Sequence, residues 1–123
     1  MARISNKAFL EAWEGPRTSK YRPEAEILFR RIRAIAPAAE LSADRTSIGF
    51  GRGDDGYCLV GMAIRADGLR YYANPGELAK HRTKLGKMLK GKCCVTLKRA
   101  NDLDETLLRR VTTASLKKPR IAA

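Results

Sequence analysis

The chain has 123 residues, 44% of them hydrophobic, which is enough for the core of one globular domain and excludes a largely disordered chain. Lys and Arg number 25 against 13 Asp and Glu, giving a formal net charge of +12. That excess predicts an anionic partner, either nucleic acid or an acidic protein, although a surface with a cationic bias and no partner is the alternative.

Neither a membrane span nor a secretory leader is predicted. No apolar run approaches the roughly 20 residues needed to cross a bilayer, and the first residues lack the continuous apolar stretch of a signal peptide. Three cysteines, an odd number, fit a reducing compartment better than a disulfide framework. We therefore expect a cytoplasmic protein that does not bind membranes.

Residues 1–21 are predicted to be an N-terminal extension with one short helical stretch that ends before Gly15. A longer helix follows, in which Pro23 suits the first turn, and Pro37 stops it. Its apolar residues fall on one side at helical spacing: Ala25, Leu28, Phe29, Ile32, Ile35 and Ala36.

Three apolar runs separated by turn residues come next, at 46–50, 57–65 and 69–73. The Asp67-Gly68 pair between the last two is a strong hairpin signal, because it tolerates the positive φ of a type I′ turn. In the middle run the alternating residues Cys58, Val60, Met62 and Ile64 share one face. These patterns predict a three-stranded antiparallel meander.

A second helix is predicted over 74–91, with Asn74 as N-cap and Gly91 as the left-handed residue at its end. A strand over 93–99 follows, and Asp102 with Glu105 forms a capping box that opens a last helix. The predicted order is α-β-β-β-α-β-α. This is an α+β fold with helices packed on one face of an antiparallel sheet, a domain over 22–117 and a basic tail over 118–123.

The order and spacing of several short motifs resemble the YdhG-like family, domain of unknown function 1801. The motifs are Ile48 to Gly51, Leu85 to Lys87, Gly91-Lys92 and Cys94, and the likeness covers roughly residues 22–117. The resemblance implies a small bacterial α+β domain without established chemistry, some relatives of which are similar to frataxin and are linked to iron delivery.

Iron delivery is therefore an alternative function. It would need clustered exposed carboxylates, because hard cations favour oxygen ligands. The candidates are Asp54-Asp55, which a turn explains, and Asp102, Asp104 and Glu105, which a helix cap explains. A tryptophan-bearing segment expected before the Ile-Gly-Phe strand is replaced by 42–46, Ser-Ala-Asp-Arg-Thr. No metal site is predicted.

The cysteines and the single histidine give no catalytic constellation. Adjacent cysteines cannot chelate one zinc as C-x-x-C does, so Cys93 is predicted to be buried with Val95 and Leu97, and Cys58 is predicted to be apolar filler. Cys94 falls on the other face, where Lys92 and Lys98 would lower its pKa if the thiol is exposed, and would make it a possible reactive thiol. His81 has no nucleophile or second ligand at a recognisable spacing, so we predict no catalytic residue and no cofactor.

The basic segment from Leu78 to Asn101 contains eight Lys or Arg residues and no acid. Such a patch would bind phosphates by counterion release, and a solvated helix face is the alternative. We predict a non-enzymatic binding domain, with nucleic acid or an acidic protein as partner and a dimer as one possible assembly. The predicted anion-binding residues are Lys80, Lys84, Lys87, Lys92 and Lys98.

Overall fold

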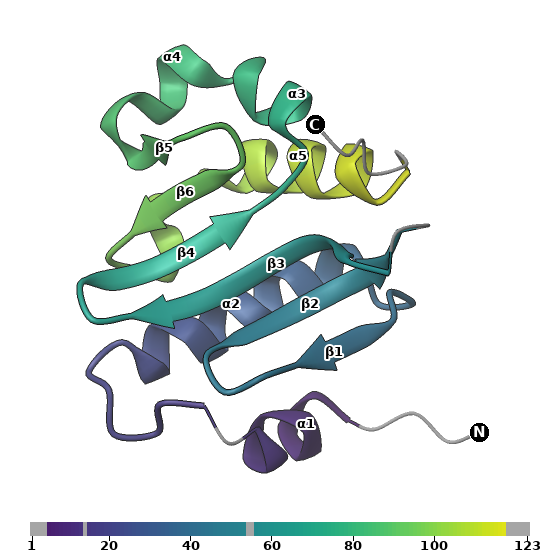
Figure 1. Cartoon of the computed structure of the whole chain (residues 1–123), viewed down its shortest axis with the longest axis vertical. Coiled ribbons are helices and arrows are strands. Elements are labelled where there is room, and N and C mark those ends of the chain that lie inside the picture. The colour runs from purple at the N-terminus through teal and green to yellow at the C-terminus, as the bar shows by residue number, and fades with distance from the viewer. Residues whose placement is uncertain (1–4, 14, 54–55, 118–123) are drawn as a thin grey trace.

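A computed structural model describes residues 5–13, 15–53 and 56–117 of the chain. It is built from one antiparallel sheet of six strands, in the spatial order β1-β2-β3-β4-β6-β5, with the two longest helices behind the sheet and the shorter ones beyond its two edges in the view of Figure 1. The strands are β1 (Leu41–Ala43), β2 (Ser47–Arg52), β3 (Cys58–Arg65), β4 (Gly68–Tyr72), β5 (Leu89–Lys90) and β6 (Cys94–Leu97).

Two amphipathic helices, α2 (Arg22–Ile35) and α5 (Glu105–Lys117), lie side by side against the same face of the sheet (Figure 1). Their apolar residues meet the inward side chains of the strands in one core. Phe29 of α2, for example, packs on Phe50 of β2 with ring centroids 5.6 Å apart. The predicted α+β class, with its helices on one face of an antiparallel sheet, is confirmed.

The meander predicted from the three apolar runs is present as β2, β3 and β4. Its register pairs Phe50 with Val60 and Ile48 with Met62, which places these four buried side chains on the helix side. The hairpin at Asp67-Gly68 joins β3 to β4, and Gly68 has the positive φ of 148° that a side chain would resist. The strand β1, which pairs with β2, was not predicted.

The prediction of one helix over 74–91 is wrong. The segment forms α3 (Pro75–Ala79), α4 (Arg82–Leu85), the 3₁₀ turn η1 (Gly86–Met88) and β5. The prediction that Asn74 caps the start of this segment is confirmed, because Asn74 accepts hydrogen bonds from the N–H groups of Gly76 and Glu77. The segment breaks at Lys80 and His81, and again at Gly86, whose φ of 54° ends α4.

Two smaller predictions also need correction. Gly91 does not end a helix but turns the chain from β5 to β6, with φ of 67°. Asp102 is not the cap of the last helix: its carboxylate accepts from the N–H groups of Lys98 and Arg99 in front of the 3₁₀ turn η2 (Ala100–Asp102). Asp104 caps α5 by accepting from the N–H of Leu107.

The described part of residues 1–21 packs on the domain. Helix α1 (Asn6–Ala12) is capped by Ser5, and Leu10 and Trp13 are 3% and 4% exposed members of the core. The Trp13 indole donates a 2.8 Å hydrogen bond to the carbonyl of Asp44 beside β1. The basic tail, 118–123, and the Asp54-Asp55 turn lie outside the described residues. No helix in the described part of the chain has both the length and the apolar character that a membrane span requires.

Candidate anion-binding surface

The segment that joins β4 to β6 carries four of the five predicted anion-binding lysines, and it forms one edge of the molecule (Figure 1). Lys98 is separate from them. It follows the far end of β6, donates to the backbone carbonyl of Asp67, and lies 5.8 Å from the ring centroid of Tyr21. The five lysines therefore do not make one patch.

Two of the four edge lysines are neutralised by carboxylates. Lys80 lies 3.2 Å from Glu77, and Lys84 lies 3.1 Å from Asp104, the residue before α5. The other cations of the segment are exposed and have no carboxylate within 4 Å among the described residues. We call these four residues the cationic edge: Arg82, Lys87, Lys90 and Lys92.

The face of the sheet opposite α2 and α5 is covered by no described helix, and we call it the open face (Figure 1). Alternation along β4 fixes which residues lie there. Tyr71 is 0% exposed and its hydroxyl is 2.6 Å from that of Thr112 in α5, so the next residue, Tyr72, points to the open face. Strand register then places Gly61, Cys94 and Lys90 beside it in one cross-strand row.

Small residues surround Tyr72 on the open face. Gly49 and Gly61 are cross-strand partners, and Ala63 lies two residues further along β3. The Cδ2 atom of Tyr72 is 3.7 Å from the point a Cβ on Gly61 would occupy, so its ring covers the space that the glycine leaves. The ring is partly exposed, whereas Gly49, Gly61 and Ala63 beneath are buried.

Two arginines stand next to this ring. The Arg65 guanidinium donates to Thr46 at 3.1 Å and to the Tyr72 hydroxyl at 3.4 Å. Arg70 pairs with Asp67 at 2.9 Å. Asp67 hydrogen-bonds to Arg70, and this lowers the pKa of its carboxyl group. Together with Lys90, these arginines give the open face a positive balance.

Cys94 was predicted to share a face with Thr96, and the register places both on the open face. The exposure on which a lowered pKa depended is not found, because Cys94 is half-buried: burial raises the pKa of the Cys94 thiol, while nearby Arg70 and Arg65 and a hydrogen bond with Tyr72 oppose that rise. The Thr96 hydroxyl is buried and has no hydrogen-bond partner among the described residues. The site is thus polar and cationic, but its thiol is not activated.

The other sequence candidates give no metal or catalytic centre. Cys93 lies in the turn before β6 and is half-buried, so the prediction that it is buried with Val95 and Leu97 is wrong. Cys58 is also half-buried, and it does not share the face of Val60 as predicted, because its Cβ lies 2.7 Å from the point that a Cβ on Gly49 would occupy on the open face. Asp104 and Glu105 pair with Lys84 and with Arg31 and Arg109. In the described part of the chain, no three His, Cys, Asp or Glu side chains gather where they could bind a metal ion.

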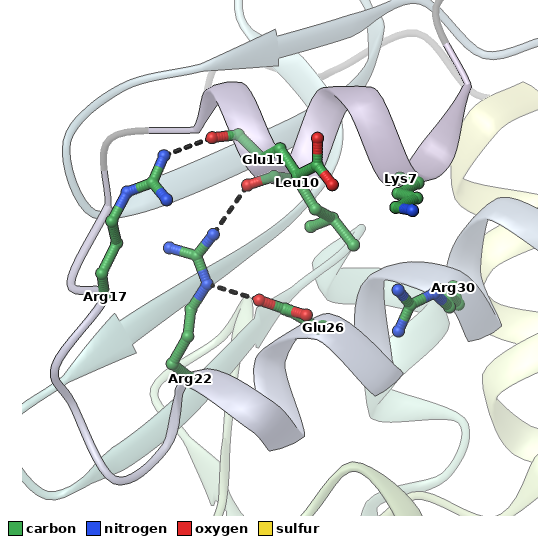
Figure 2. Close-up of a pocket in the computed structure, with 7 residues that line it drawn as sticks. All are labelled: Lys7, Leu10, Glu11, Arg17, Arg22, Glu26 and Arg30. Atoms are coloured by element: carbon green, nitrogen blue, oxygen red, sulfur yellow. Dashed lines mark hydrogen bonds and ion pairs between the residues drawn. The ribbon is translucent and has the colours of Figure 1, made fainter.

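A hollow of about 340 Å³ lies between α1 and α2 (Figure 2). At its floor Arg22, 6% exposed, pairs with Glu26 at 2.9 Å and donates to the Leu10 carbonyl at 2.8 Å. Its guanidinium also lies 4.5 Å from the Trp13 ring centroid. The remaining nitrogen, Nη1, is shielded from solvent, so Arg22 fastens α1 to α2 and is not presented to a ligand. The lining residues are Lys7, Leu10, Glu11, Arg17, Arg22, Glu26 and Arg30.

Sequence reasoning missed Arg65 and Arg70, although a signal was present. They flank the predicted Asp67-Gly68 turn, and the residues that alternate with them are apolar: Ile64, Leu69 and Tyr71. Period-two alternation therefore assigns both arginines to the face away from the core. Comparison with known proteins adds no further guide: no family model, no curated protein and no solved structure matches this chain.

Proposed function

We propose that this protein is a non-enzymatic, YdhG-like binding module that holds an anionic partner by charge. The observation that carries the proposal is the cationic edge, four exposed cations without a carboxylate partner among the described residues. A polyanion bound there would release its condensed counterions, and the affinity would fall steeply with added salt.

The register connects this edge with the open face. Lys90 on β5 is the cross-strand partner of Cys94 on β6, and Cys94 is in turn the partner of Tyr72 on β4. Arg70 precedes Tyr72 by two residues in the same strand. Adjacent strands lie about 4.8 Å apart, so cations continue from the edge onto the sheet without an intervening helix. Binding rather than thiol catalysis is proposed because burial raises the pKa of Cys94.

The test is a titration with a single-stranded DNA oligonucleotide and with polyglutamate, each at several salt concentrations. The variant Lys87→Glu with Lys92→Glu should weaken polyanion binding and reduce the slope of log affinity against log salt by about two. The matched control is Lys7→Glu with Lys20→Glu, which changes the net charge equally at exposed positions away from the edge.

The control should bind with a nearly unchanged slope. Absence of binding to both polyanions at low salt would overturn the proposal. Equal losses in the two double variants would also overturn it, because net charge alone would then explain the affinity.

A further inference from the structure

We propose that the open face binds single-stranded nucleic acid, with one base stacked on Tyr72 and the adjacent phosphates held by Arg65, Arg70 and Lys90. This inference rests on the proposed function and names its partner. It is carried by a partly exposed aromatic ring set among cations on a sheet face that no described helix covers.

The setting of Tyr72 favours stacking. Its ring covers the position of a Gly61 side chain, and its hydroxyl is held by Arg65 at 3.4 Å. These contacts fix the ring before a ligand arrives, which reduces the entropy lost on binding. Every nucleobase presents a π-face, so one held ring can accept any base in a single strand.

Short side chains form the floor of the open face beside the ring. A Cβ on Gly49 would lie 2.7 Å from the Ser42 hydroxyl and from the Cys58 Cβ, and a Cβ on Gly61 would lie 3.4 Å from the Cys58 Sγ, so these two small side chains cover the glycines and keep the floor low. Other open antiparallel sheets hold two or three bases on aromatic side chains in this way. The three strand steps from β3 to β5 give a span of roughly 14 Å for such a segment.

The charges fit a phosphate backbone. Arg65, Arg70 and Lys90 project from three strands of the open face, and in those strands and their turns Asp67 is the one described acid. Asp67 already pairs with Arg70 and its pKa is lowered, so it stays ionised at neutral pH. A phosphate would therefore have to share the Arg70 guanidinium with the Asp67 carboxylate. Arg65 is exposed and donates hydrogen bonds only to hydroxyl and carbonyl oxygens among the described residues, and its charge also acts on the nearby Asp44 carboxylate without a direct ion pair. It is therefore the stronger candidate for a phosphate.

An acidic protein is the alternative partner, and the Tyr72 ring distinguishes it from nucleic acid. A polypeptide of carboxylates would be held by charge and would gain little from Tyr72, whereas a nucleobase gains stacking energy that salt does not screen. The factor by which replacement of Tyr72 weakens nucleic-acid binding should therefore be the same at low and high salt.

The experiment measures fluorescence anisotropy of a labelled oligothymidine, with Tyr72→Leu, Tyr72→Phe and the control Tyr21→Leu, whose ring lies at the start of α2. Tyr72→Leu should weaken binding about tenfold with an unchanged salt slope, a loss at the lower end of the range for one stacked base. Tyr72→Phe should stay within about twofold, and Tyr21→Leu should bind as the parent protein does.

Polyglutamate binding should not respond to Tyr72→Leu. The inference is overturned if oligothymidine binds Tyr72→Leu as well as the parent, if Tyr21→Leu loses as much, or if polyglutamate binds more tightly than oligothymidine. Salt-dependent binding in any of these cases would leave the proposed function standing. Circular dichroism of each variant checks that the fold is kept.

Discussion

The two faces of the sheet are built from alternate residues of the same strands, yet they have different chemistry. The face under α2 and α5 carries large apolar side chains that are almost completely buried, among them Phe50, Met62 and Tyr71. The open face carries glycine and alanine beneath Tyr72, Arg65 and Arg70. The apolar packing is therefore concentrated on one face, and the other is the face that we propose to contact a partner.

The pair Tyr71 and Tyr72 shows this division within two residues. Tyr71 is fully buried, and burial raises the pKa of its hydroxyl, which is bonded to Thr112. Tyr72 is partly exposed and contacts Arg65 and Cys94. The difference comes only from the period-two alternation of a strand, since the two residues are chemically identical.

The largest effect is expected on the helix side. Phe50→Ala should lower the free energy of unfolding by about 3–5 kcal/mol, because it removes a fully buried ring that packs on Phe29 and leaves a cavity. The measurement is denaturant unfolding, with Tyr72→Ala as the comparison on the open face. A loss at Tyr72 as large as that at Phe50 would show that the open face also belongs to the core.

A smaller loss of about 1–2 kcal/mol is expected from Tyr71→Phe, because the buried Thr112 hydroxyl loses its 2.6 Å partner. Thr112→Val should recover part of that loss in the double variant, since no unpaired hydroxyl then remains. A double-mutant cycle measures the coupling. Strictly additive losses would mean that the two hydroxyls do not interact.

The smallest effect concerns the Cys94 thiol. Since burial raises its pKa, the pH at which half of the thiol is ionised should lie above the ordinary thiol value of about 8.5, and alkylation at pH 7 should be slower than for a model thiol. Arg70→Gln should move the pH midpoint higher still, because a nearby positive charge is lost. Alkylation rates against pH in a Cys58→Ser, Cys93→Ser background test this, and a midpoint below 8.5 would refute it.

Periodicity and turn chemistry were sufficient to predict the meander, α2 and the cap at Asn74. They failed over 74–91, because Leu78, Leu85, Met88 and Leu89 have helical spacing while Gly86 takes a positive φ and Leu89 pairs with Val95. Tertiary pairing of two residues overrode a helical pattern there. The packing of α1 was missed because it depends on Trp13 reaching Asp44 and Arg22 reaching Leu10, contacts that no local pattern encodes.

The candidate site was predicted in part. A run of cations without acids identified Lys87 and Lys92, but the carboxylates that pair with Lys80 and Lys84 come from Glu77 and Asp104, one of them distant in sequence. Arg65 and Tyr72 meet only because β3 and β4 form a hairpin. The contact between them could be found only from the strand register.

The most direct test of the central claim, that the open face is the binding surface, is amide chemical-shift mapping during titration of the ¹⁵N-labelled protein with oligothymidine at low salt. We expect the largest changes at Arg65, Arg70, Tyr72 and Lys90, with smaller changes at Lys87 and Lys92. Changes confined to α2 and α5, or no changes at saturating oligonucleotide, would contradict the account.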